Sequence, residues 1–189
     1  MRLNTKILLA IKIISVVLVS CNSEINCPED NFPKTDKWIL FRDTVTSKHG
    51  SWPRNGYFDL KGKPMIPLDK YFCTTDTFEY YGVVMEISGG RLIGIDKKGK
   101  ELFEAVPSGE GFYPIEEKEG RIMIIKNGKY GFANHKGEIV IEPKYSCAES
   151  FKNGKAKVSY SCTKIKSEYL KWKMDSVFFI DKCGNEIRE

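Results

Sequence analysis

The sequence contains few of the residue patterns that support acid–base or nucleophilic catalysis. His49 and His135 are the two histidines, and His49 lies in a polar loop without a nearby acidic partner. No Gly-x-Ser-x-Gly motif is present to hold a catalytic serine. The acidic run that contains Glu116, Glu117 and Glu119 is typical of a solvated surface. We therefore expect no catalytic residue and no enzyme activity.

Motifs for metals and phosphates are missing as well. The sequence contains no Cys-x-x-Cys, His-Glu-x-x-His or calcium-loop pattern. The glycine pair Gly89 and Gly90 lacks the Lys-Ser or Lys-Thr ending of a phosphate-binding loop. We expect no metal site and no cofactor.

Residues 1–20 have the pattern of a signal peptide. They contain three basic residues, no acidic residue and an apolar run from Ile7 to Val19 that Lys12 interrupts. This run is shorter than the roughly 20 apolar residues that a transmembrane helix needs. We predict that residues 1–20 are removed from the mature protein.

The end of this segment, Leu18-Val19-Ser20-Cys21, resembles the lipobox of bacterial lipoproteins. The resemblance implies cleavage before Cys21, a diacylglycerol on its thiol and an acyl chain on its amine. Two or three acyl chains anchor a protein stably to a bilayer. The implied location is the cell membrane or the outer membrane, facing outside the cytoplasm, and the sequence leaves open which membrane. An ordinary signal peptide followed by a chance cysteine is the alternative.

Removal of residues 1–20 lowers the net charge from +5 to +2, since that segment holds three basic residues and no acidic one. A nearly neutral chain argues against nucleic-acid binding, which needs a concentrated basic surface. Residues 21–37 are polar, contain two prolines and show no apolar periodicity. We predict a flexible tether over residues 21–37 and a folded domain over residues 38–189.

Five cysteines remain after lipidation of Cys21: Cys27, Cys73, Cys147, Cys162 and Cys183. Disulfides are permitted outside the cytoplasm, and an odd number leaves at least one thiol unpaired. Cys147 and Cys162 bracket a predicted strand region and are the preferred pair. Several connectivities remain open, and buried reduced cysteines are the alternative.

The folded domain contains a turn motif that recurs four times. Each copy has apolar or small residues, then Asp or Asn, two variable residues and Gly. The four copies are Asp59 to Gly62, Asp96 to Gly99, Asn134 to Gly137 and Asp181 to Gly184, so the glycines follow one another at steps of 37, 38 and 47 residues. His135 occupies the first variable position, where the other copies have Leu60, Lys97 and Lys182. We expect this position to be a solvated turn.

The chemistry of this motif favours a tight hairpin. Asp or Asn at the first turn position accepts hydrogen bonds from backbone N–H groups, and Gly three residues later tolerates a positive φ. The flanking segments, such as residues 121–126 and 138–142, are apolar and rich in β-branched residues. We predict an all-β fold in which units of about three strands stack on their neighbours.

One copy closely resembles a WG repeat. The run from Gly128 to Tyr145, followed by Phe151, Gly154, Ala156 and Val158, has the pattern of that family, with Tyr130 in place of the signature Trp. The resemblance implies an all-β module of antiparallel hairpin repeats stacked side by side, about four units with degenerate ends. The family occurs in bacterial envelope and secreted proteins, has no generally assigned activity and transfers no catalytic residues.

Two functional hypotheses follow. The first is a non-catalytic, membrane-anchored interaction or scaffold module with an unknown protein partner and no nucleic acid. The alternative is an envelope protein that binds carbohydrate or peptidoglycan, or a small hydrolase, acting through exposed aromatic side chains and carboxylates. Candidate aromatic residues are Trp38, Trp52, Trp172, Tyr71, Phe72, residues 78–81, Phe112 and Tyr113.

Overall fold

The structure is a computed structural model that describes residues 35–109, 113–165 and 171–187. All regular elements in these ranges are β-strands, β1 to β17, and their pairing is antiparallel throughout. The prediction of an all-β hairpin fold is confirmed. None of the described residues belongs to a helix that could cross a bilayer.

Four units of three strands make up most of the domain, and in each unit the Asp/Asn–Gly turn joins the second strand to the third. Unit 1 consists of β1 (Trp38–Ser47), β2 (Gly50–Phe58) and β3 (Pro64–Ile66). Unit 2 consists of β6 (Tyr81–Met85), β7 (Leu92–Asp96) and β8 (Glu101–Ala105). Unit 3 consists of β9 (Arg121–Lys126), β10 (Lys129–Asn134) and β11 (Ile139–Tyr145). Unit 4 consists of β13 (Lys155–Ser159), β16 (Phe178–Asp181) and β17 (Glu186–Ile187).

The remaining strands are short connections and one insertion. They are β4 (Phe72–Cys73), β5 (Thr77–Phe78), β12 (Cys147–Ala148), β14 (Cys162–Ile165) and β15 (Lys171–Met174). The β14–β15 hairpin lies between the first and second strands of unit 4. This insertion accounts for the longest step between turn glycines.

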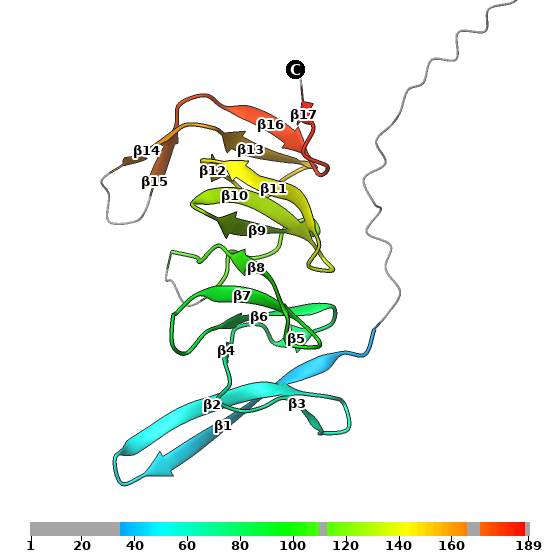
Figure 1. The fold of residues 1–189 in the computed structure, drawn as a ribbon, viewed down its shortest axis with the longest axis vertical. Coiled ribbons are helices and arrows are strands. Elements are labelled where there is room, and N and C mark those ends of the chain that lie inside the picture. Colours follow the sequence, from blue (N-terminus) through cyan, green and yellow to red (C-terminus); the bar gives the residue numbers. More distant parts are fainter. Residues whose placement is uncertain (1–34, 110–112, 166–170, 188–189) are drawn as a thin grey trace, which may run out of the picture.

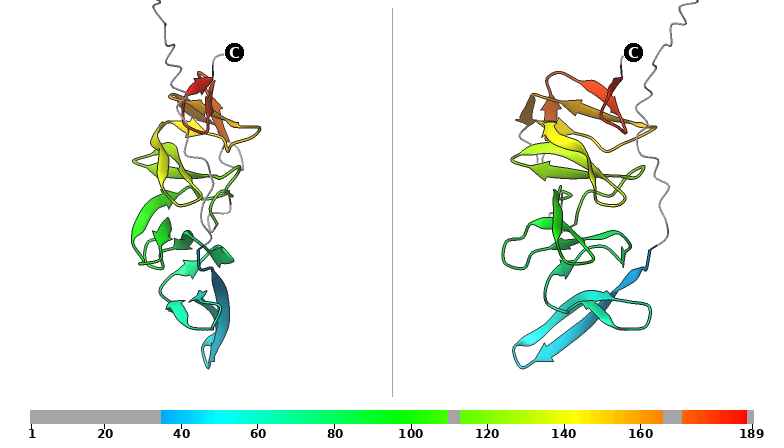
Figure 2. Two further views of the ribbon diagram at one scale, coloured as in Figure 1. Left: turned by 90° about the vertical axis from the view of Figure 1, so that its right-hand side faces the viewer. Right: turned by 45° about the vertical axis from the view of Figure 1, so that its right-hand side comes forward.

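The units follow one another along the long axis of the molecule, from the blue β1 to the red β17 (Figure 1). Pairing of β8 with β9 merges units 2 and 3 into a seven-stranded sheet with the order β11-β10-β9-β8-β7-β6-β4. Unit 1 forms its own sheet with β5, and unit 4 forms one with β12. The side views show the same succession of layers (Figure 2).

The hydrophobic core lies at the junctions between units. Trp38 and Tyr57 of unit 1 share a buried cluster with Val84 of unit 2. Another cluster joins β-strands of units 2 and 3, and a third joins units 3 and 4 through side chains that include Phe132 and Ile180. A three-stranded unit cannot bury its own apolar face, so the stack is held together by these shared clusters.

All four turns have the same hydrogen bonds. In the first, Asp59 Oδ1 accepts from the backbone N–H groups of Lys61 at 2.9 Å and Lys63 at 2.8 Å. The side chains of Asp96, Asn134 and Asp181 accept from the two equivalent N–H groups of their own turns. The φ angles of Gly62, Gly99, Gly137 and Gly184 are 82°, 78°, 83° and 86°. Glycine adopts this left-handed conformation without the steric cost that a Cβ would add.

Gly131 in β10 has a different role, which is to let two backbones cross closely. A Cβ at this position would lie 2.3 Å from the carbonyl oxygen of Ile141 in β11. Gly56 holds the equivalent place in unit 1, where a Cβ would lie 2.5 Å from the carbonyl oxygen of Ile66. The glycine that follows Tyr130 is therefore required by the approach of the third strand to the second.

Candidate binding pocket between the second and third units

The first variable residue of each turn lies against the preceding unit where one exists. The Lys97 ammonium lies 5.4 Å from the centroid of the Trp38 ring of unit 1. The backbone carbonyl of Lys182 accepts a hydrogen bond from Arg121 Nε of unit 3 at 3.1 Å. Leu60 belongs to the first unit in the described part of the chain, and it is 74% exposed. Lys97, His135 and Lys182 are instead partly buried against the unit before them, and the side chain of His135 remains 43% exposed.

His135 occupies this position in unit 3 and reaches toward two carboxylates. Its Nδ1 lies 3.0 Å from Oε1 of Glu117, in the loop between β8 and β9. Its Nε2 lies 3.7 Å from Oε2 of Glu79, which precedes β6. The ring of Tyr80 meets the imidazole edge to face, with centroids 5.6 Å apart. The turn brings together side chains from three separate parts of the chain.

Glu117 is held in place by a second donor. The Tyr81 hydroxyl donates a hydrogen bond to Oε2 of Glu117 at 2.9 Å. Burial, together with the nearby Glu117 carboxylate, raises the pKa of Tyr81 far above its usual value. The phenol therefore stays protonated and remains a hydrogen-bond donor at physiological pH. Glu117, predicted to belong to a solvated acidic run, is instead fixed between Tyr81 and His135.

These side chains line a pocket of about 380 Å³. Its walls come from the segment between β4 and β6, from β6, from residues 113–117, from Ile122 of β9 and from the unit 3 turn. Pockets that bind small ligands have volumes of roughly 300–1,000 Å³. The cavity therefore has room for a small group or a single side chain.

The pocket is acidic and partly apolar. Three of its lining residues carry carboxylates, namely Glu79, Glu116 and Glu117. Among the described residues that line it there is no lysine and no arginine. Outside the lining, Lys37 lies 3.9 Å from Glu79, and Lys118 pairs with Glu116 at 2.5 Å. The remaining walls include the side chains of Val83, Ile115 and Ile122 and three tyrosines.

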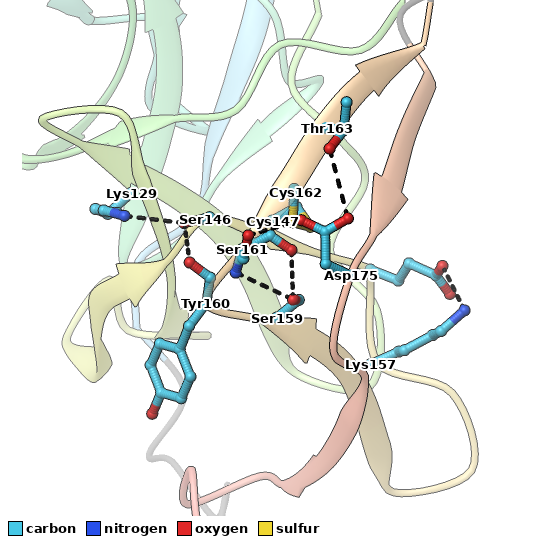
Figure 3. Close-up of a disulfide and its surroundings, with 11 residues drawn as sticks. Lys129, Ser146, Cys147, Lys157, Ser159, Tyr160, Ser161, Cys162, Thr163 and Asp175 are labelled. Carbon is cyan, nitrogen blue, oxygen red and sulfur yellow. Dashed lines mark hydrogen bonds and ion pairs between the residues drawn. A yellow bond between two sulfur atoms is a disulfide. The ribbon is translucent and has the colours of Figure 1, made fainter.

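The preferred cysteine pair lies in another part of the fold. The structure joins Cys147 of β12 to Cys162 of β14 by a disulfide, with 6.3 Å between the Cα atoms (Figure 3). Beside the bond, the Ser161 hydroxyl donates to Asp175 at 2.7 Å, and the Ser159 hydroxyl donates to the carbonyl oxygen of Ser161 at 2.7 Å (Figure 3). These contacts tie the inserted β14–β15 hairpin to unit 4.

The other cysteines have different environments. Cys73 is a free, buried thiol at the position in β4 that corresponds to Cys147 in β12. Cys183 is disulfide-bonded, and its partner lies outside the described residues. Cys21, the predicted lipid attachment point, also lies outside them, as does Cys27.

The candidate aromatic residues lie in different parts of the fold. Trp38 and Phe78 are buried in the core, with ring centroids 4.8 Å apart. Trp52 is 45% exposed on the β1–β2 hairpin, and Tyr113 is exposed at the pocket. Phe112 and the side chain of Trp172 lie outside the described part of the chain. The aromatic residues therefore do not form one continuous surface within the described residues.

The sequence motifs did not reveal the pocket. Glu117 comes from the loop between β8 and β9, whose path the repeat pattern does not specify. The sequence does show that His135 occupies the same turn position as Lys97 and Lys182. The structure confirms this equivalence, because the residue after each of them donates the same backbone hydrogen bond to the Asp or Asn of its turn. The aligned turn sequences do not indicate that each turn contacts the unit before it.

Comparison with known proteins gives one match. No curated protein and no solved structure matches the chain. The family model described as WG containing repeat matches residues 130–160, a range that begins at Tyr130 and includes the turn with His135. This part of the chain is therefore similar to a WG repeat, and it contributes His135 to the lining of the pocket.

Proposed function

We propose that the protein is a membrane-anchored, non-catalytic WG repeat lipoprotein of the cell envelope whose repeat domain binds a protein partner. The observation that carries the proposal is the pocket between units 2 and 3, where Glu117, His135 and Tyr81 are held together by hydrogen bonds. A preorganised set of polar groups in a concave site is characteristic of binding. The match to a repeat family supports an interaction module.

Two of the three threonine hydroxyls in the pocket are held by hydrogen bonds within the fold. The Thr74 hydroxyl donates to the carbonyl oxygen of Val83 at 2.7 Å, and the Thr75 hydroxyl lies 2.7 Å from the Tyr57 hydroxyl. In these contacts each hydroxyl is hydrogen-bonded to a carbonyl or hydroxyl oxygen, and not to the general base that a nucleophile needs. Their hydrogen bonds fix the wall between β4 and β6.

The proposed anchor is acylated Cys21, and its support is the lipobox-like sequence before it. Cys21→Ala should abolish metabolic labelling with palmitate and leave an unprocessed precursor in the membrane fraction. Cys27→Ala is the matched control and should be labelled and processed normally. Unchanged labelling of the Cys21→Ala variant would refute the lipoprotein proposal.

The proposed binding surface can be tested by site-specific photo-crosslinking in cells. A photoreactive phenylalanine at Tyr113 would lie at the pocket, and the same residue at Val177 would lie just before β16, outside the pocket lining. Both native side chains are 46% exposed, so the two positions are matched for accessibility. We expect a discrete crosslinked protein from position 113 and none from position 177. Identical products from both positions would contradict a role for the pocket.

Glycan binding is the second candidate function, and the exposed Trp52 is the observation that favours it. An exposed indole can stack on a sugar ring. Retention of the full-length protein on insoluble peptidoglycan, with loss of retention in Trp52→Ala, would support this candidate. Equal retention of the wild type and the variant would exclude Trp52 as a glycan-binding residue.

A further inference from the structure

We propose that the pocket between units 2 and 3 accepts a lysine or arginine side chain from an exposed segment of the protein partner. This inference rests on the proposed function, because it names the chemical group that such a partner would insert. Its basis is the combination of carboxylates, aromatic rings and apolar walls around one cavity.

The charge of the lining favours a cation. Glu79 faces Nε2 of His135 and Glu117 faces Nδ1. Glu116 precedes Glu117 in the same wall of the pocket. Lys37 and Lys118, which contact Glu79 and Glu116, lie outside the lining. A cavity bordered by carboxylates, with low-dielectric walls, attracts a positive group and disfavours a negative one.

Glu79 is the carboxylate best placed to receive the ligand. Its side chain is 41% exposed, and its ion-pair contacts, with Lys37 at 3.9 Å and with His135 at 3.7 Å, are both longer than a hydrogen bond. A ligand ammonium or guanidinium could therefore approach its oxygens without displacing a short hydrogen bond. Glu117 differs, because Tyr81 already donates to it at 2.9 Å.

The other walls match the rest of a basic side chain. Lysine and arginine carry an apolar stem below a charged tip. Val83, Ile115 and Ile122 offer apolar contacts to such a stem, and the rings of Tyr80 and Tyr113 add aromatic surface that attracts cations. An anionic or purely apolar group would satisfy only part of this lining.

The size of the cavity limits what enters it. A volume of about 380 Å³ is at the lower end of the range for small-ligand pockets. It is suited to one side chain with its flanking backbone outside, and it is too small for a helix. We therefore expect recognition of a single basic residue in an extended segment.

The test is the binding of short peptides to the full mature protein, purified from membranes in a neutral detergent. Capped glycine-rich pentapeptides with a central Lys, Arg, Gln or Glu would carry an uncharged fluorophore, and fluorescence anisotropy would report their affinity. We expect the Lys or Arg peptide to bind at least about threefold more tightly than the Gln peptide, and the Glu peptide to bind most weakly. Higher salt should reduce this preference.

Glu79→Gln is the diagnostic variant, because it removes the charge and keeps the size of an exposed side chain. It should reduce the affinity for the basic peptide by about three- to tenfold, the loss expected for one charge-assisted contact. Glu142→Gln is the matched control, since Glu142 is an exposed residue of β11 outside the pocket lining. The control should bind all peptides as the wild type does.

The outcomes separate this inference from the proposed function. Equal affinity for the Lys, Arg and Gln peptides, or an unchanged affinity in Glu79→Gln, would overturn the basic-side-chain proposal. If crosslinking from position 113 still captured a protein, the proposed interaction function would stand even though the basic-side-chain proposal had failed. Binding of glucosamine oligosaccharides in place of the peptides would also overturn the proposal and would favour a glycan ligand.

Discussion

Replacement of Gly131 by alanine is a sharp test of how the repeat is built. Gly131 lies in β10, where β11 crosses with a shift in strand register. A Cβ would lie 2.3 Å from the Ile141 carbonyl oxygen and 2.6 Å from the Pro143 nitrogen. Real Cβ atoms essentially never approach another heavy atom closer than 3.0 Å. Since both neighbours are backbone atoms, no side-chain rotation can relieve the contact, and β11 must move away from β10.

The expected cost follows from the packing around that crossing. Forcing extra volume into a packed region costs about 1–3 kcal/mol. Movement of β11 would also disturb Ile141, which shares a buried cluster with Phe132 of β10 and with residues of unit 4. The lower backbone entropy of the unfolded alanine chain offsets about 0.4–1 kcal/mol. Because the clash is with backbone atoms, the packing cost should lie at the upper end of its range, and we expect Gly131→Ala to reduce the free energy of unfolding by about 2 kcal/mol.

Urea unfolding with the disulfides intact, followed by circular dichroism, would measure this loss. The substitution should lower the unfolding midpoint by about 0.7–2 M, given a typical dependence of roughly 1–3 kcal/mol per molar urea. Gly109→Ala is the control, because nothing lies within 4 Å of its Cβ and its φ is not positive; we expect a change within about 0.5 kcal/mol. Gly128→Ala, in open space at a φ of +71°, should cost about 1–2 kcal/mol through backbone strain alone. A Gly131→Ala midpoint equal to that of Gly109→Ala would refute the close-crossing explanation.

Three further predictions concern the disulfide, the free thiol and a buried tyrosine. The double variant Cys147→Ser/Cys162→Ser should lose about 3 kcal/mol in urea unfolding, because the bond closes a loop with a sequence separation of 15 residues; an unchanged midpoint would contradict this. Burial raises the pKa of Cys73 to about 12, so at about pH 8 iodoacetamide should label it only after unfolding, and mass spectrometry would reveal any labelling of the folded protein that contradicts this. Burial also raises the pKa of Tyr57 above its usual value of 10.0. The stabilisation from burying the neutral phenol is therefore complete well below pH 10 and is lost as the pH rises above about 10. The urea midpoint should therefore fall between about pH 9 and pH 11, and a smaller fall in Tyr57→Phe would assign part of the effect to this residue.

The sequence was sufficient to predict the repeating framework. Asp or Asn followed three residues later by Gly specifies a local turn, and the four turns have the same backbone hydrogen bonds. The alternating apolar strands around them specify which elements pair with their neighbours in sequence. The prediction of about four stacked hairpin units is confirmed because these signals are local, and each unit of the stack contacts mainly the next one.

The sequence was not sufficient to predict the pocket, because its residues meet through the stacking of units. His135, Glu117 and Glu79 come from a turn and from two separate connecting segments. Nothing in their spacing along the chain indicates that the unit 3 turn faces Tyr81 of unit 2. The polarity of His135 and Glu117 predicts solvation, yet tertiary packing places both at the wall of a cavity.

The central claim is that the pocket between units 2 and 3 binds a partner protein through a basic side chain. Photo-crosslinking in cells from position 113, compared between the native background and Glu79→Gln, tests this claim most directly. We expect a discrete protein adduct in the native background, several times weaker with Glu79→Gln and unchanged with Glu142→Gln. The absence of any adduct from position 113, or an adduct of equal yield in all three backgrounds, would contradict the claim.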